Sequence, residues 1–208
     1  FSALDPNLRR EMGDFLLELQ RKENLTVVLV THDQEEALRL AHRIALMKDG
    51  EILQVDEGEK LYYAPVNEYV ARFMGKGNSI LGRVEKGVFS CPYFSFPVEE
   101  EEGNYSFFFR ERQLSFTEEI GERQIAEKQG ESLHEVEEVS VATEALSPFK
   151  LIEKEYLGEF FRAFYKNSAG QVLSCLIERG EELPEKGFPT LCFKEGEEKI
   201  LFLLKDGK

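Results

Sequence analysis

The stretch TVVLVTHDQEEAL, at residues 26–38, decides how the first part of the chain is expected to fold. Residues 27–30 form a continuous aliphatic run, which is typical of a strand buried on both faces of a parallel sheet. Asp33 with Glu36 three residues later has the form of a capping box, although Asp replaces the usual Ser or Thr. This pattern predicts a helix over about residues 34–41.

His32 stands at the carboxyl end of the predicted strand, directly before the helix. In a parallel α/β sheet, ligands collect at this end of the strands. An imidazole placed there could donate a hydrogen bond to a phosphate oxygen or orient a water molecule. The position alone leaves a second interpretation equally open, in which His32 is a capped turn residue without a ligand.

The first part of the chain alternates helix and strand signals around this stretch. Asp5-Pro6 predicts a helix start, because Asp is a favoured N-cap and Pro fits the first helical position. A hairpin is predicted around the turn Asp49-Gly50, with strands at residues 44–47 and 52–55. Two short helices broken at Pro65 should follow.

From about Gly75 the sequence pattern changes. Short β-like runs separated by turn residues predict a small barrel or sandwich. Gly75, Gly77 and Gly82 predict a linker before it, and the strongly acidic residues 117–147 are interpreted as a solvated insertion. The predicted strands are residues 80–84, 105–109, 160–165, 172–177, 190–193 and 200–204.

Composition excludes several classes of function. The 208 residues carry a formal net charge of −14, whereas a nucleic-acid binder needs a basic face to displace counterions. We therefore expect no nucleic acid as a partner.

The odd number of widely spaced cysteines argues against a disulfide framework. No metal site is predicted, because the three histidines lack zinc-ligand spacing. No apolar run reaches the roughly 18 residues of a membrane span.

Several motifs, in order, resemble the C-terminal part of an ABC-transporter nucleotide-binding domain. They are SALD at residues 2–5, THDQEEA at residues 31–37 and MKDGEI at residues 47–52. Later segments resemble the OB-like TOBE regulatory domain of importer ATPases of the maltose, spermidine, iron and sulfate type. These segments are GNSILGRV, FFFRERQLSF, EKEYLGEFFRAFY and KGFPTLCFKEGEEKILFLL. The resemblance implies a truncated P-loop NTPase-type α/β core over residues 1–74 and an all-β OB-like barrel over residues 75–208.

The resemblance also implies a role for each matching residue. SALD is the D-loop of this family, and the histidine at the strand end is its switch histidine. His32 would then be a catalytic residue that contacts the γ-phosphate of ATP and positions the attacking water. The D-loop residues would bind the nucleotide across the interface of a homodimer; they are Ser2, Ala3, Leu4 and Asp5.

The intact subunit of such an importer uses ATP and Mg²⁺. It would drive a membrane permease as a peripheral protein at the cytoplasmic face of the inner or plasma membrane. This chain, however, contains no G-x-x-x-x-G-K-[ST] phosphate loop and no LSGGQ-like signature. The carboxylates that hold magnesium and activate water would precede Phe1. We therefore expect a fragment of a longer subunit that by itself binds no cofactor and hydrolyses no ATP.

Truncation would also leave the strand at residues 27–30 without its neighbours. Unpaired strand edges invite pairing with other chains. We expect a dimer, a rearranged sheet or a poorly soluble N-terminal part as the result.

Other functions remain open to different degrees. The C-terminal barrel could act alone as a regulatory, ligand-binding or dimerisation module. A nucleic-acid-binding barrel would need a basic groove beside its aromatic residues, and residues 75–208 are net acidic; the aromatic residues are therefore interpreted as core. A metal-dependent enzyme that uses His32 as a ligand is not expected, because the sequence offers no second metal ligand near His32. The sequence does not distinguish an inorganic ion from a polyamine or a sugar as the transported solute.

Overall fold

The computed structural model describes residues 5–118, 147–193 and 200–204. The chain divides into two compact units, Phe1–Met74 and Gly75–Lys208, which we call the first and the second unit. Most of the acidic stretch at residues 117–147 lies outside the described residues, as do Ser2, Ala3 and Leu4. No helix in the described ranges is long and apolar enough to cross a membrane.

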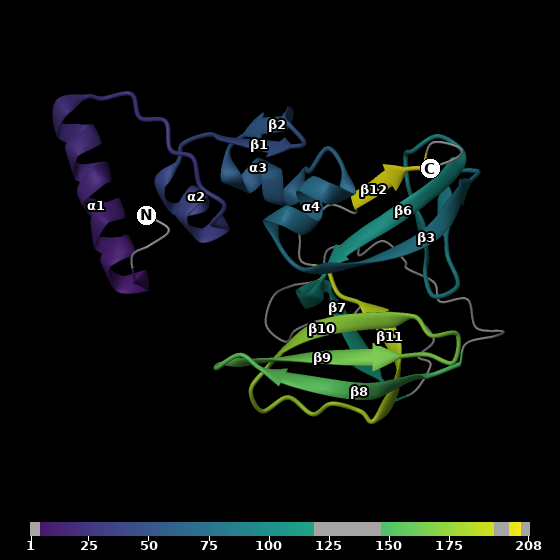
Figure 1. Cartoon of the computed structure of the whole chain (residues 1–208). Helices are drawn as coiled ribbons and strands as arrows, with labels where there is room; N and C mark the ends of the chain where they lie inside the picture. Colours follow the sequence, from purple (N-terminus) through teal and green to yellow (C-terminus); the bar gives the residue numbers. More distant parts are fainter. Residues whose placement is uncertain (1–4, 119–146, 194–199, 205–208) are drawn as a thin grey trace, which may run out of the picture. The chain divides into compact units, whose positions relative to one another are not determined.

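The first unit is mainly helical (Figure 1). Asp5 begins the first helix as predicted, since its carboxylate accepts hydrogen bonds of 3.0 Å from the backbone N–H groups of Asn7 and Leu8. The helix ends at Asn24, which adopts the left-handed conformation with φ 49°. The elements are α1 (Pro6–Glu23), α2 (Gln34–Leu40), β1 (Ile44–Lys48), β2 (Glu51–Asp56), α3 (Gly58–Tyr63) and α4 (Glu68–Met74).

The predicted hairpin is confirmed as the antiparallel pair β1–β2. Asp49 and Gly50 both have positive φ, 52° and 84°, as the favoured two-residue hairpin turn requires. The break between α3 and α4 is held by Gln54. Its side-chain amide donates to the carbonyl of Ala64 at 3.1 Å and accepts from the N–H of Val66 at 3.0 Å. The small core of the unit consists of Leu46, Leu61, Val70 and Met74.

The strand predicted at residues 27–30 is wrong for this structure. Residues 25–31 belong to no helix or strand, and the side chains of Val28 and Val30 are 87% and 92% exposed. A strand is stable only when neighbouring strands satisfy its backbone hydrogen bonds. Within the described part of the first unit, β1 and β2 are the only strands, and they pair with each other. The aliphatic run therefore has no sheet to join, and a P-loop NTPase-type core is not confirmed.

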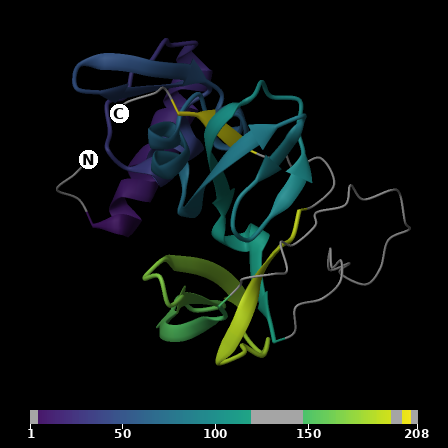
Figure 2. The ribbon, with the colours of Figure 1, turned by 90° about the vertical axis from the view of Figure 1, so that its right-hand side faces the viewer.

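The described residues of the second unit form mainly antiparallel strands (Figures 1 and 2). One five-stranded sheet has the order β12-β6-β3-β4-β5, and the other has the order β10-β9-β8-β11-β7. The elements of the first sheet are β3 (Gly77–Glu85), β4 (Val88–Ser90), β5 (Ser95–Pro97), β6 (Gly103–Arg110) and β12 (Ile200–Leu203). Those of the second are β7 (Leu114–Thr117), β8 (Phe149–Tyr156), β9 (Phe160–Lys166), β10 (Val172–Glu178) and β11 (Lys186–Leu191), with the 3₁₀ turn η1 (Glu111–Gln113) between β6 and β7.

This arrangement confirms a β-rich second part with many short strands. The OB-like barrel and its TOBE identity stay predictions. The linker predicted from glycines is wrong, because Gly77 and Gly82 lie inside β3. A Cβ atom at Gly82 would come within 2.3 Å of the ring of Phe89, so the glycine there allows a close approach of the ring. The strand predicted at residues 190–193 lies earlier, as β11.

The two sheets enclose one aromatic core. Phe107 and Phe109 of β6 stack in a tilted arrangement at 5.1 Å, and Phe116 of β7 stacks on Tyr165 of β9 at 3.7 Å. These four side chains are at most 7% exposed. Aromatic residues bury large apolar areas, which explains how so acidic a chain still forms a core. The interpretation of the aromatics as core residues is confirmed for Phe107, Phe108 and Phe109, whereas Phe160 and Phe161 are only half-buried.

Candidate functional site

The turn that carries His32 is fixed on both sides of the histidine. The backbone N–H of Asp33 donates to Oγ1 of Thr31 at 3.0 Å, which closes a local Ser/Thr-type turn. Asp33 Oδ1 accepts from the backbone N–H of Glu36 at 3.1 Å and begins α2. Asp33 is thus confirmed as the N-cap of α2, but the reciprocal half of the predicted capping box is not formed, because the N–H of Asp33 donates to Thr31 and not to Glu36. The His32 side chain itself is exposed.

The second oxygen of the Asp33 carboxylate reaches a different helix. Asp33 Oδ2 accepts from Nη1 of Arg9 in α1 at 3.1 Å. The side chains of Arg9 and Asp33 are 29% and 33% exposed, so this ion pair is partly shielded from water. The N–H of Glu36 is the strongest influence on Asp33 and holds the pKa of its carboxyl below the ordinary value of 3.8. Arg9 lowers the pKa further, while desolvation opposes both.

A hollow of about 150 Å³ adjoins this turn. It combines groups of both charges: the Arg9 guanidinium and His32 imidazole can donate hydrogen bonds, and two carboxylates can accept them. Glu36 is only 7% exposed, and its Oε1 has no hydrogen-bond partner among the residues described. The lining residues are Arg9, Leu29, Val30, Thr31, His32, Asp33 and Glu36.

The structure places the remaining predicted site residues only in part. Asp5 is exposed and serves as the N-cap of α1. Ser2, Ala3 and Leu4 lie outside the described residues, so the D-loop assignment stays a prediction. Arg9 was not singled out from the sequence, because nothing in the pattern links a helical arginine to an aspartate 24 positions later. No group of three His, Cys, Asp or Glu side chains suited to a metal ion occurs in the described ranges.

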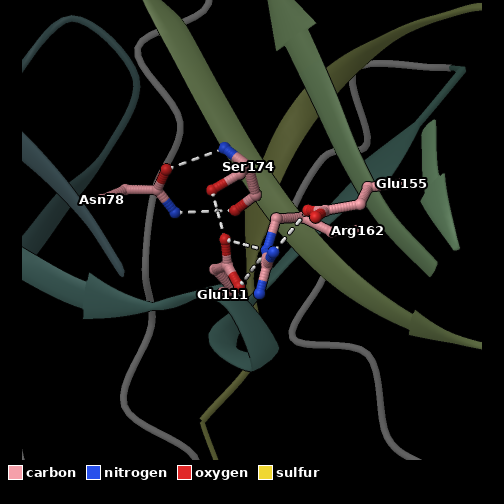
Figure 3. A network of polar contacts seen from close by, with 5 residues as sticks. All are labelled: Asn78, Glu111, Glu155, Arg162 and Ser174. Carbon is pink, nitrogen blue, oxygen red and sulfur yellow. Dashed lines mark hydrogen bonds and ion pairs between the residues drawn. The ribbon is translucent and has the colours of Figure 1, made fainter. Parts of the chain in front are cut away.

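A second cluster of polar residues lies in the second unit (Figure 3). The side-chain amide of Asn78 in β3 exchanges two hydrogen bonds of 2.8 Å with the backbone of Ser174 in β10. Ser174 Oγ donates to Glu111 at 2.7 Å, and Arg162 Nε donates to the same carboxylate at 2.9 Å. Arg162 Nη1 also donates to Glu155 at 2.5 Å.

This cluster joins the two sheets. Burial lowers the pKa of Arg162, but its bonds to Glu111 and Glu155 outweigh that effect and raise the pKa overall. These contacts pair the polar groups with one another and do not direct them into a cavity. A buried network satisfied in this way stabilises a fold and gives no vacant place for a ligand. We therefore treat the His32 turn as the candidate functional site.

Comparison with known proteins points to one class of transport protein. No family model matches the chain. The spermidine/putrescine import ATP-binding protein PotA of Chromobacterium violaceum is 51% identical over 84 residues, 40% of this chain and 23% of that protein. The Fe(3+) ions import ATP-binding protein FbpC of Photobacterium profundum is 36% identical over 124 residues, 57% of this chain and 35% of that protein.

The name of a third relative refers to a different solute. The trimethylamine N-oxide transport system ATP-binding protein TmoW of Pelagibacter ubique is 53% identical over 73 residues, 35% of this chain and 21% of that protein. The chain thus spans only 21% to 35% of the length of these three curated relatives. These homologues are ATP-binding subunits of ABC importers, which agrees with the resemblance of the SALD and THDQ motifs.

Proposed function

We propose that this chain forms part of the ATP-binding subunit of an ABC importer, with His32 as the residue that contacts the γ-phosphate. The observation that carries the proposal is the His32 turn, whose backbone is fixed by Thr31, Asp33 and α2 while the imidazole is exposed. A donor held in place before reaction stabilises developing charge without reorganisation. The similarity to importer ATP-binding proteins supports the same function.

His32 and the D-loop residues would have separate roles toward the bound ATP. ATP with Mg²⁺ supplies the phosphoanhydride bond that is cleaved. His32 donates a hydrogen bond from its imidazole to an oxygen of the γ-phosphate and orients the attacking water. Ser2 to Asp5 would contact the nucleotide held by the second subunit of a homodimer. The described residues offer a donor for the phosphate, and no group of three side chains suited to a metal ion occurs among them.

The proposed partners follow from this function. The homodimer would transmit ATP hydrolysis to permease subunits at the cytoplasmic face of the membrane. Because the sequence has no phosphate-loop lysine, the 208-residue chain alone should hydrolyse no ATP. The named solutes of the three relatives differ, so they favour no single solute for this chain.

The second unit would act as the OB-like TOBE regulatory domain. Its own aromatic core favours a second proposal, in which it serves as a regulatory or dimerisation module. Melting of the whole chain with and without spermidine, putrescine or ferric iron, together with sedimentation, tests this. A solute-dependent melting shift or a stable dimer would support it, and an unshifted monomer would exclude it for these solutes.

The proposed ATPase function can be tested in a chimera. Residues 1–74 of this chain would replace their counterpart in PotA of C. violaceum, and the ATPase rate would be measured with His32 and with His32→Ala. We expect the chimera to hydrolyse ATP and His32→Ala to lower the rate by a factor of about 10². His42→Ala is the matched control, because His42 is an exposed histidine beyond the end of α2. Equal rates for the His32 and His42 variants would overturn the proposal.

A further inference from the structure

We propose that Arg9 is a positioning residue that couples helix α1 to the orientation of His32. This inference rests on the proposed function, since it concerns the residue assigned to the γ-phosphate. Arg9 would act only through Asp33 and would not touch the nucleotide itself. Its role would be to connect the segment where α1 begins with the turn that carries the histidine.

The Asp33 carboxylate is the centre of the coupling. Its Oδ1 accepts from the N–H of Glu36 and fixes α2, while its Oδ2 accepts from Arg9 and fixes α1. The backbone N–H of the same residue is held by Thr31. His32 lies between Thr31 and Asp33, so a displacement of Arg9 moves one of the two anchors of the histidine.

Charged contacts join helix α1 to both ends of helix α2. Arg9 pairs with Asp33 near the start of α2, and Arg39 near its end pairs with Asp14. Arg39 also donates to the carbonyl of Arg10 at 3.3 Å. By contrast, Phe15 on α1 is 58% exposed and packs little. Removing one arginine should therefore loosen one end of the contact and leave the other in place.

The two arginines differ in what they anchor. Arg9 lies in the first helical turn after the Asp5 cap and lines the same hollow as His32. Arg39 reaches the middle of α1, away from Thr31 and Asp33. A shift at the start of α1, where SALD ends, would reach His32 through Arg9 and Asp33. The pair thus provides a direct link between the two segments assigned to the nucleotide.

The test follows the imidazole signals of the full 208-residue chain by NMR at constant pH without nucleotide. Arg9→Met should displace the Cε1–Hε1 cross peak of His32 by more than its linewidth and leave that of His42 in place. His32→Gln assigns the peak. Arg39→Met is the matched control, and we expect it to leave the His32 peak within its linewidth.

Two further variants show whether the effect passes through the ion pair. Asp33→Asn keeps a side-chain oxygen to cap α2 but removes the charge, so adding Arg9→Met to it should cause no further displacement. Arg9→Lys keeps the cation and should return the peak at least halfway to its original position. Circular dichroism establishes that each variant keeps its helices.

Three results would overturn the coupling: an unmoved His32 peak in Arg9→Met, equal displacements in Arg9→Met and Arg39→Met, or additive displacements in the Asp33→Asn background. None of these measurements involves ATP. Failure of the coupling is therefore distinct from failure of the ATPase proposal, which is read from the hydrolysis rate of the chimera.

Discussion

At the scale of single residues, neighbouring residues of the His32 turn have different roles. Thr31 and Asp33 hold the backbone, and the histidine between them has an exposed side chain. An accessible imidazole on a fixed backbone suits contact with a phosphate group arriving from solution. Local spacing predicted Asp33 as the cap of α2. It placed His32 at the end of a buried strand, however, and the structure has no strand at residues 27–30. Local spacing could not predict Arg9, because long-range ion pairs leave no periodic signal.

Asp33 should make the stability of the first unit depend on pH in the acid range. A folded-state pKa below the ordinary value of 3.8 means that Asp33 stabilises the fold above this pH. The stabilisation is lost as the pH falls through the lower, folded-state pKa. We expect Asp33→Asn to weaken the pH dependence of the melting temperature below about pH 4. An identical pH dependence in both proteins, measured by circular dichroism, would contradict this.

Glu111 should contribute far more to stability than Glu155, although both bind Arg162. The Glu111 and Arg162 side chains are 8% and 11% exposed, whereas that of Glu155 is 47% exposed. Breaking a buried pair leaves an uncompensated charge, so Glu111→Ala should lower the free energy of unfolding by about 3 kcal/mol. Glu155→Ala should cost less than about 1 kcal/mol. Urea unfolding measures both, and similar losses would refute the assigned burial.

At the scale of elements, local signals predicted the helices of the first unit and the β1–β2 hairpin correctly. The Asp5 cap, the Asp49-Gly50 turn and the break at Pro65 each depend on residues close in sequence. The strand at residues 27–30 failed because a strand depends on partners that local sequence does not specify. The strands β4, β5, β7 and β8 were also missed. The first three have only three or four residues, and β8 is rich in charged residues that interrupt its apolar pattern.

The exposed aliphatic run gives a prediction about Val30. In the 208-residue chain its side chain is 92% exposed, so Val30→Asn should change the free energy of unfolding by less than about 0.5 kcal/mol. Leu46→Ala is the buried control, at 3% exposure, and should cost about 2–5 kcal/mol. If residues 27–30 form a paired strand in the PotA chimera, Val30→Asn should destabilise it clearly. A large loss in the chain itself would show that the run is buried.

At the scale of the whole molecule, the acidic composition and the fold are compatible because a run of acidic residues lies outside the core. Glu99 to Glu102 lie between β5 and β6, outside the aromatic core. The sequence predicted a β-rich second part, but it did not predict two five-stranded sheets joined by Asn78 and Ser174. These residues are 96 positions apart, and their pairing depends on the complete topology.

Alkylation of the Cys175 thiol should measure the global unfolding of the second unit. Burial in the core raises the pKa of its thiol to about 12. At pH 8 the folded chain therefore holds on the order of 10³ times less Cys175 thiolate than an ordinary cysteine would. We expect iodoacetamide to label Cys175 only at the rate of global unfolding, while the half-buried Cys192 reacts sooner. Mass spectrometry of labelled peptides measures this, and equal labelling rates in native buffer would contradict it.

The central claim is that His32 contacts the γ-phosphate in an importer ATP-binding subunit. The most direct measurement is the ATPase rate of the PotA chimera with His32, with His32→Ala and with His42→Ala. Our account predicts a loss of about 10² for His32→Ala and none for His42→Ala. A His32→Ala chimera that hydrolyses ATP at the unchanged rate would contradict the account and leave His32 a structural turn residue.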